Sequence, residues 1–373
     1  MTKAPEESLL IAIGGENLFG AERRVIRLAA TVARLAPQYR IILVLSAQLY
    51  ATARSNPVIG KLVSSFESRD CLVVLPGVRP FRRGRRLGLL AAQIRAGSPI
   101  FSSYGTDRFL IALRFLGIPF TYEVTSPAVV DRIARRNRTW LPRAAKSFLC
   151  VSPSVARKLQ DFFASKGIDA SAKISSYPSP YLDPEVFQDD PKSKVIVIGS
   201  RFAERKNVHV FAQALVTALP QLPGWSVKIC GNGPFEEQIR ATLAEHIAAG
   251  TVEVGYVPNL SVELRSSQVF VSMIEKDNYP SQSVIEAMGA GNALLLSDRG
   301  DSHRFIDHAD PNGTLVEIDP PAIARALVDL CLSDRLNEMG ASSRRHLGHL
   351  CDERDYVGTL LRSCGYSLSN HGG

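Results

Sequence analysis

Short apolar runs alternate with amphipathic segments along most of the chain. The run at 9–13 is closed by Gly14 and Gly15, and apolar residues then recur at helical spacing from Val25 to Leu35. Continuous apolar runs are typical of strands buried on both faces of a parallel sheet. In the first half the pattern predicts strands at 9–13, 40–46, 71–77, 98–104, 120–125 and 147–152, a helix at 109–118, and a helix N-capped by Ser152 or Ser154.

The alternation is interrupted once. Residues 175–192 are rich in Pro, Ser and Asp, which favours an interdomain linker. Beyond it we expect strands at 194–200, 225–231, 251–257, 268–274, 293–298 and 314–318, and helices at 208–219, 283–291, about 320–346 and 353–365. This order predicts an α/β fold of two Rossmann-like, doubly wound domains that face each other across a ligand cleft at the carboxyl ends of their strands.

Composition narrows the class of protein. The 373 residues are 45% apolar and 21% charged, as in ordinary globular chains, and no apolar run reaches membrane-spanning length. The N-terminus lacks the pattern of a signal peptide, and the six cysteines are scattered without a CxxC pair. We therefore expect a cytoplasmic protein with buried, reduced thiols. The seven histidines form no metal pair, and we expect neither a metal nor another cofactor.

Positive charge is concentrated in the first half. Residues 1–190 carry 27 Lys and Arg against 15 Asp and Glu, whereas 191–373 carry 17 against 21. Such asymmetry indicates either an anionic partner for the N-terminal half or a merely solvated basic surface.

The candidate chemistry follows three strands of the second half. Arg201 and Lys206 come directly after the strand at 194–200, where two cations suit a diphosphate whose charge develops on departure. Gly233 lies in the GNGP turn after the strand at 225–231, and its lack of a side chain permits close backbone approach. Taken singly, these features equally fit a solvated basic loop and an ordinary turn.

The third segment leads into the helix at 283–291. After Pro280 and Ser281, the backbone amides near Gln282 and Ser283 can point at an anion. Glu286 lies one turn inside, where its carboxylate can accept hydrogen bonds from ribose hydroxyls, or simply complement the helix dipole. The conjunction of three such segments, each after a strand, predicts a nucleoside-diphosphate site.

These segments resemble a known family. The motifs GSRFAERKN, ICGNGP, GYVP and PSQSVIEAMGAG, in this order, are similar to those of the retaining glycosyltransferases of family 4, which have the GT-B fold. The resemblance is strong over about 195–300 and looser before 190. It implies an acceptor-side domain at 1–188, joined by the C-terminal helix 353–373, and a donor-binding domain at 189–352.

The resemblance also implies residue roles. Arg201 and Lys206 would bind the donor diphosphate and Glu286 the ribose. The amides of Gln282 and Ser283 would hold the distal phosphate, Val257 would lie near the base, and Gly15 would lie near the donor sugar. Gly233 and Ser281 would also belong to the donor-binding residues.

Two positions depart from the family pattern. Asn278 stands where the family usually has a first glutamate, seven residues before the second, and the resemblance places this amide near the transferred sugar. Thr125 stands where the family often has a histidine, with Glu123 two residues earlier. These changes indicate either a different sugar or weakened catalysis.

An arginine-rich stretch at 78–95 precedes an apolar, helix-like segment. It suits an anionic membrane surface or a lipid-linked acceptor, or else a plain solvated surface, and it lacks the aromatic residues of a nucleic-acid site. Its arginines are Arg79, Arg82, Arg83, Arg85 and Arg86.

The sequence thus predicts a retaining hexosyltransferase that uses a nucleoside-diphosphate sugar, with uridine slightly favoured as the base. Its acceptor would be a hydroxyl of a saccharide or lipid-linked saccharide in cell-envelope polysaccharide or glycolipid synthesis. We expect a cytoplasmic protein, peripheral on the inner face of the membrane if the basic stretch binds lipid. The alternative is a non-catalytic glycosyltransferase-like subunit that binds a sugar nucleotide or a partner protein.

Overall fold

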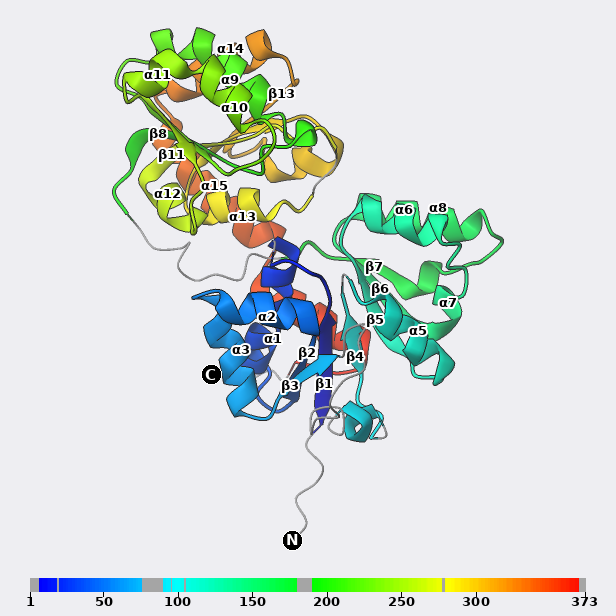
Figure 1. Ribbon diagram of the computed structural model, residues 1–373. Coiled ribbons are helices and arrows are strands. Elements are labelled where there is room, and N and C mark those ends of the chain that lie inside the picture. The colour runs from blue at the N-terminus through cyan, green and yellow to red at the C-terminus, as the bar shows by residue number, and fades with distance from the viewer. Residues whose placement is uncertain are drawn as a thin grey trace. The chain divides into compact units, whose positions relative to one another are not determined.

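The computed structural model describes residues 7–18, 20–75, 90–94, 96–103, 105–179, 190–276 and 279–368. The chain forms two compact units, with labels as in Figure 1. Unit 1 comprises Met1–Leu182 together with Glu353–Gly373, and unit 2 comprises Asp183–Asp352. Each unit is a parallel sheet with helices on its faces, so the predicted pair of Rossmann-like domains is confirmed.

Unit 1 contains a seven-stranded sheet in the order β3-β2-β1-β4-β5-β6-β7. Its strands are β1 (Ser8–Ile13), β2 (Arg40–Ser46), β3 (Leu72–Leu75), β4 (Ile100–Ser102), β5 (Phe120–Val124), β6 (Ala145–Cys150) and β7 (Ile174–Ser176). Its helices are α1 (Gly20–Leu35), α2 (Ala47–Ser55), α3 (Ile59–Ser68), α5 (Asp107–Phe115), α6 (Pro127–Arg135), α7 (Leu141–Ala144), α8 (Pro153–Ala164) and α16 (Glu353–Cys364).

Strand β1 shows why its apolar run is continuous. Leu9 and Ile11 pack into the core formed with α1, α3 and α16, whereas Leu10 and Ala12 pack into the core on the other face, with α5, α6 and α8. Successive side chains of a strand point to opposite faces, so a sheet covered on both sides needs apolar residues at every position.

Unit 2 contains a six-stranded sheet in the order β10-β9-β8-β11-β12-β13. Its strands are β8 (Ser193–Gly199), β9 (Ser226–Cys230), β10 (Val252–Gly255), β11 (Ser267–Ser272), β12 (Ala293–Ser297) and β13 (Gly313–Val316). Its helices are α9 (Val208–Ala218), α10 (Glu236–Thr242), α11 (Ala244–Ala248), α12 (Leu260–Ser266), α13 (Gln282–Gly289), α14 (Pro320–Cys331) and α15 (Leu336–Leu350).

Two sequence-based predictions are wrong in detail. The predicted linker begins inside the sheet, because β7 pairs with β6 as a three-residue edge strand too short to give an apolar signal. The helix predicted over 320–346 is two helices, α14 and α15. Between them the Ser333 hydroxyl accepts a hydrogen bond from the backbone N–H of Arg335, a local turn that competes with helical pairing.

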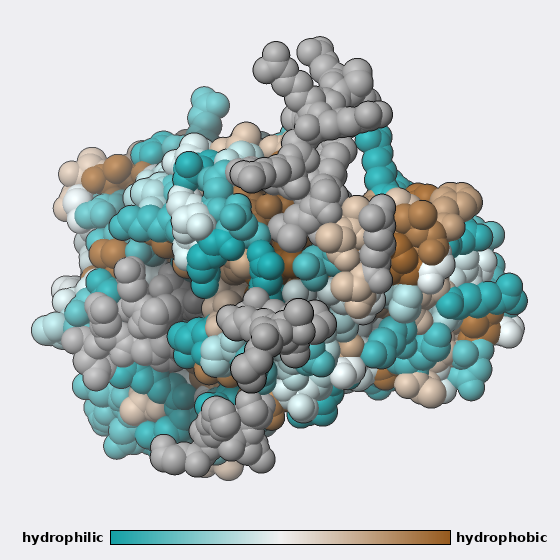
Figure 2. Space-filling model, turned by 90° about the horizontal axis from the view of Figure 1, so that it is seen from below, coloured by the Kyte–Doolittle hydropathy of each residue, from teal (hydrophilic) through white to brown (hydrophobic). Residues whose placement is uncertain are grey.

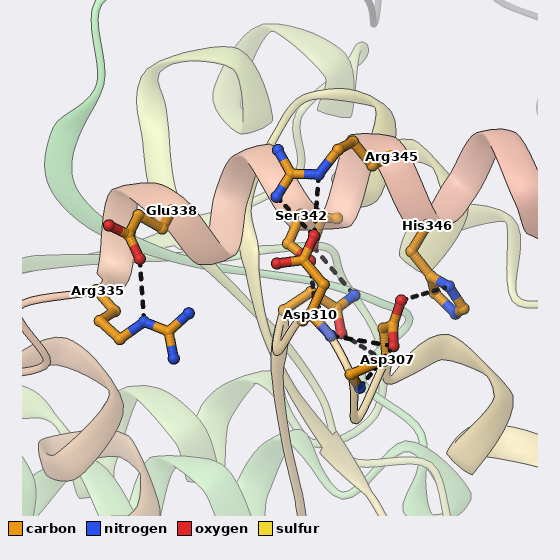
Figure 3. Close-up of polar contacts among 10 residues, drawn as sticks. Asp307, Asp310, Arg335, Glu338, Ser342, Arg345 and His346 are labelled. Carbon is orange, nitrogen blue, oxygen red and sulfur yellow. Dashed lines mark hydrogen bonds and ion pairs between the residues drawn. The ribbon is translucent and has the colours of Figure 1, made fainter.

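Polar contacts attach the loop between β12 and β13 to α15 (Figure 3). Two guanidinium nitrogens of Arg345 donate to Asp310 at 2.9 and 2.6 Å, which holds the pKa of that carboxyl below its usual value. Asp307 accepts hydrogen bonds from the backbone N–H groups of Ala309 and Asp310, which lower its pKa, and lies 3.6 Å from His346. These acidic residues therefore serve loop structure.

The cysteines and helices also match the expectations from composition. All six cysteines are buried free thiols, as predicted. Among the described residues, no helix combines the length and apolar character needed to cross a membrane.

A buried ion pair holds three segments of unit 1 together. Arg24 of α1 donates to Glu123 of β5 at 2.6 Å and to Ser179 at 2.7 Å, and Tyr356 of α16 donates to the other oxygen of Glu123 at 2.6 Å. Ser103 also donates to Glu123. Burial, the largest single effect, lowers the pKa of Arg24, but the interactions with Glu123 and Tyr356 together outweigh it and the net pKa is raised. The guanidinium therefore stays charged inside the core.

We expect Glu123→Gln to destabilise the protein by about 3–5 kcal/mol, because it leaves the buried Arg24 charge without its counter-charge. The matched control is Glu353→Gln, which removes the exposed partner of Arg34 on the same helix α1 at a similar 2.7 Å. An exposed pair contributes only about 0–1 kcal/mol. Urea unfolding measures both, and equal effects would show that the buried pair is not a principal constraint.

Candidate functional site

The carboxyl edge of the unit 2 sheet has a topological switch point. All its strands are parallel, and β8 lies between β9 and β11. The connection after β8 leads toward β9, whereas the connection after β11 leads toward β12 on the opposite side. The two connections therefore diverge, which is where open parallel sheets bind ligands.

Backbone contacts fix the segment after β8 against the turn after β9. The Ser200 N–H donates to Cys230 O at 3.0 Å and the Phe202 N–H to Asn232 O at 2.8 Å. A Cβ at Gly233, whose φ is +150°, would lie 2.6 Å from Phe202 O. The predicted close approach at Gly233 is thus an approach to the chain's own backbone, which positions the segment that contains Arg201.

The same segment is joined to the connection after β11. Asn207, in the left-handed conformation with φ +50°, precedes α9 and donates from Nδ2 to Met273 O at 3.1 Å. The Glu275 N–H donates to Arg205 O at 3.0 Å. The segment that contains Lys206 therefore lies beside the start of the connection that leads from β11 to α13, at the switch point.

Lys206 and Arg201 differ in their surroundings. Arg201 is exposed at the end of β8, while Lys206 is partly buried in the short helix Glu204–Lys206. Loss of hydration, and secondarily the neighbouring Arg205, lowers the pKa of Lys206 to about 8. Within the described residues no hydrogen bond or ion pair engages its ammonium. A desolvated cation beside a strand terminus favours an anionic ligand.

Helix α13 begins beside this region, after the connection from β11. Ser281 is its N-cap, yet its side chain makes no capping hydrogen bond and instead lies 3.2 Å from the Ser283 hydroxyl. Ser281 is buried, and Gln282 and Ser283 are half-buried. A helix start without a side-chain cap leaves its dipole available to an anion.

Glu286 does not act as a first-turn dipole partner. It lies in the second turn of α13, is 7% exposed, and accepts a 2.6 Å hydrogen bond from the Ser261 hydroxyl. Ser261 in turn donates its backbone N–H to Asn259, the N-cap of α12. Val257 is half-buried in the short connection that leads from β10 to this N-cap. The chain that follows Val257 thus supplies Ser261, whose hydroxyl fixes the carboxylate of Glu286.

In unit 1 the predicted Gly-rich turn lies at that unit's own switch point, between β1 and β4. A Cβ at Gly14 would lie 2.2 Å from Gly105 O, so the turns after these two strands can meet only as glycines. Gly15 lies against the Glu22 side chain. Thr125 is half-buried directly after β5, two residues beyond the ion-paired Glu123.

Six predicted site residues lie outside the described residues. They are Asn278 and the five arginines of the arginine-rich stretch, Arg79, Arg82, Arg83, Arg85 and Arg86.

Sequence reasoning missed two residues that shape the site, Asn207 and Ser261. Asn207 had a usable signal, since asparagine tolerates positive φ before a helix. His303 is exposed, in the short 3-10 helix Gly300–Phe305. A search of the described residues finds no group of His, Cys, Asp and Glu able to hold a metal ion.

Comparisons with known proteins find glycosyltransferases. Residues 192–333 match the family model described as "Glycosyl transferases group 1". A 152-residue stretch, 40% of the chain, is 26% identical to the GtfA subunit of the UDP-N-acetylglucosamine–peptide N-acetylglucosaminyltransferase of Streptococcus gordonii. That stretch spans only 30% of the relative's length.

Solved structures resemble the whole chain. HepE from Anabaena in complex with UDP and glucose has a TM-score of 0.71 at 15% identity, over 96% of this chain and 99% of that one. The pneumococcal O-GlcNAc transferase GtfA in complex with UDP and GlcNAc has a TM-score of 0.70 at 12% identity, over 97% and 99%. A glycosyltransferase from Rickettsia africae has a TM-score of 0.69 at 13% identity, over 96% and 98%. The predicted GT-B fold is confirmed.

Replacing Lys206 with Met should stabilise the protein at pH 7 while weakening diphosphate binding. The lysine pKa is 10.5 in the reference state and about 8 in the fold, so the folded state disfavours the ammonium. This penalty is fully present below pH 8 and disappears as the pH rises from 8 to 10.5. Wild-type affinity for UDP should accordingly fall as the pH rises through about 8, because the ammonium loses its proton.

Thermal unfolding with and without UDP, at pH 7 and pH 9, measures both effects. Lys194→Met is the control, since Lys194 is exposed near the amino end of the same strand β8. A Lys206→Met protein that binds UDP as tightly as wild type would remove Lys206 from the site.

Proposed function

We propose that the protein is a glycosyltransferase that moves a hexosyl unit from a nucleoside-diphosphate sugar to an acceptor hydroxyl, with retention of anomeric configuration. The observation that carries the proposal is that the segment after β8 is joined to the connection from β11 to α13 at the unit 2 switch point. The first segment contributes Arg201 and the desolvated Lys206, and the second leads to a helix start whose N-cap makes no side-chain capping hydrogen bond. A diphosphate supplies the charge that such a site lacks.

The donor base is proposed to be uridine. HepE is described in complex with UDP and glucose, and the GtfA relative is named for UDP-N-acetylglucosamine. In the proposed arrangement the Glu286 carboxylate, held by Ser261, accepts hydrogen bonds from the ribose, and Val257 lies near the base. The amides of Gln282 and Ser283 face the distal phosphate.

The proposed reaction is a same-face displacement. The bond from the anomeric carbon to the diphosphate oxygen breaks, and its electron pair leaves with the diphosphate. The acceptor oxygen bonds to the anomeric carbon on the same face, and its proton passes to a diphosphate oxygen. Arg201 and Lys206 stabilise the charge that develops on the leaving group.

The acceptor is proposed to be a saccharide hydroxyl, in a lipid-linked or soluble carrier. The lipid-linked form rests on the arginine-rich stretch at 78–95, so it stays a prediction from the sequence, as does a role in envelope polysaccharide or glycolipid synthesis. Gly15 and Asn278 are proposed to lie near the donor sugar, on the same basis.

A non-catalytic subunit is the second candidate. Thr125 and Asn278 differ from the pattern of the glycosyltransferase family that the sequence resembles. The Streptococcus gordonii relative is itself named as a subunit. Wild-type protein incubated with radiolabelled UDP-hexoses separates the two candidates: transfer or donor hydrolysis supports the enzyme, and nucleotide binding without turnover supports the subunit.

We expect Arg201→Ala to lower turnover by about 100-fold or more, because one cation no longer stabilises the leaving diphosphate. Arg335→Ala is the control, as it removes only an exposed ion pair with Glu338 in the same unit. The initial rate of hexosyl transfer is the measurement. Turnover within a factor of two of wild type would contradict the assignment of Arg201.

We expect Ser261→Ala to weaken UDP binding by about fivefold to tenfold, the effect of one lost hydrogen bond to a charged group that orients the ligand contact. Ser266→Ala on the same helix removes a hydroxyl that donates only to the backbone carbonyl of Glu263. Calorimetric titration with UDP and with uridine compares them. If both variants bind like wild type, Ser261 serves only to satisfy a buried carboxylate.

A further inference from the structure

Helix α5 of unit 1 presents apolar side chains to solvent. Phe115 is 81% exposed, Leu116 is 66% exposed and Ile111 is 38% exposed, whereas Leu110 and Leu113 of the same helix are buried. Figure 2 shows apolar surface on the side of the view where α5 lies, with hydrophilic surface beside it. Burial of Leu110 and Leu113 suffices to attach the helix to the sheet, so the fold does not explain the outer side chains.

The exposed residues lie on one face of the helix. Arg108, Ile111, Ala112 and Phe115 are spaced three and four positions apart, and Leu116 follows at the helix end. We call these five residues, together with Arg114, the α5 surface. Apolar residues clustered in this way mark an interaction site more often than scattered ones do.

The chemistry around the α5 surface is cationic. Arg114 lies over the rings of Phe115 and Trp140, at 5.9 and 4.9 Å. Arg143 of α7 is exposed in the next helix after Trp140. Residues 107–146 contain eight Lys and Arg against three acidic residues.

The acidic residues of this region are already paired. Asp107 at the start of α5 accepts hydrogen bonds from Arg136 and Arg138, and Asp131 pairs with Lys158. The third is the core residue Glu123. Positive charge therefore remains uncompensated beside the apolar side chains.

We propose that the α5 surface docks on a lipid bilayer that contains anionic lipid. Phe115, Leu116 and Ile111 enter the headgroup region, and Arg108 and Arg114 contact the lipid phosphates. Exposed apolar residues flanked by arginines match such a surface in both chemistry and charge. A protein partner would need a complementary acidic face. The inference is independent of the transferase proposal, because vesicle binding is measured without donor or acceptor. Variants of the α5 surface separate its contribution from any binding by the stretch at 78–95.

The test is flotation of the full chain with vesicles of phosphatidylcholine alone and of phosphatidylcholine mixed with phosphatidylglycerol. Wild type should float with the anionic vesicles. The double variant Phe115→Ser, Leu116→Ser should partition at least about tenfold more weakly, because two apolar side chains no longer leave water. The control variant Val216→Ser, Leu332→Ser changes two similarly exposed apolar residues of unit 2 and should float like wild type.

Two further measurements complete the test. Arg108→Gln with Arg114→Gln should weaken binding and reduce its dependence on salt, and thermal unfolding of each variant checks that the fold is kept. Binding to anionic vesicles should also shift the fluorescence of Trp140, because Trp225 is buried. Absence of wild-type flotation, or flotation unchanged by the Phe115 and Leu116 changes, would overturn the proposal. So would light scattering that shows the α5 surface to join two copies of the chain.

Discussion

The backbone of unit 2 constrains the Lys206 ammonium to a position partly removed from water, where two connections of the sheet diverge. Hydration normally stabilises such a charge, and here desolvation lowers its pKa to about 8. The segment that carries Lys206 is fixed to the β9 turn by the backbone N–H of Phe202 and to the β11 connection by the side chain of Asn207. A desolvated cation held in this way is a candidate for binding an anion.

Unit 1 depends on a charge treated in the opposite way. The guanidinium of Arg24 is also removed from water, but Glu123, Ser179 and Tyr356 satisfy it completely enough to raise its pKa. Arg24 lies in α1 and its partners come from β5, α16 and the chain just after β7, so the network ties the C-terminal helix to the N-terminal sheet. A network whose polar groups are hydrogen-bonded rigidifies a core. The Lys206 ammonium has no hydrogen bond or ion pair within the described residues, and it can therefore bind an anionic ligand. A buried charge therefore stabilises the core in unit 1, whereas in unit 2 we propose that it binds a ligand.

The sequence predicts the elements that depend on interactions between residues close together in the chain. Continuous apolar runs located most of the strands, because sheets covered on both faces require them. Of the two predicted N-caps of α8, Ser152 and Ser154, the structure selects Ser152, whose hydroxyl accepts from the Val155 N–H. The sequence pattern missed β7, whose three residues carry little apolar signal, and the short helices α2, α3, α6, α7, α10, α11 and α12. Arg201, Lys206 and Glu286 are candidates because of their places after strands. The contact of Ser261 with Glu286 was not found, because it joins positions 25 residues apart that only the tertiary structure brings together.

The sequence reveals the proposed site of unit 2 more clearly than the interaction surface of unit 1, and the difference has a physical reason. A diphosphate imposes a fixed geometry of donors and cations, so a site for it is expected to leave short, ordered motifs, and the proposal of such a site rests on the motifs at 199–207 and 281–286. An interaction surface needs only area and charge, which many sequences supply, and its residues need not recur at fixed spacing. The α5 surface illustrates this: in the sequence its apolar residues read as part of an ordinary buried helix. Only exposure in the folded chain separates Phe115 and Leu116 from the core residues Leu110 and Leu113 that precede them.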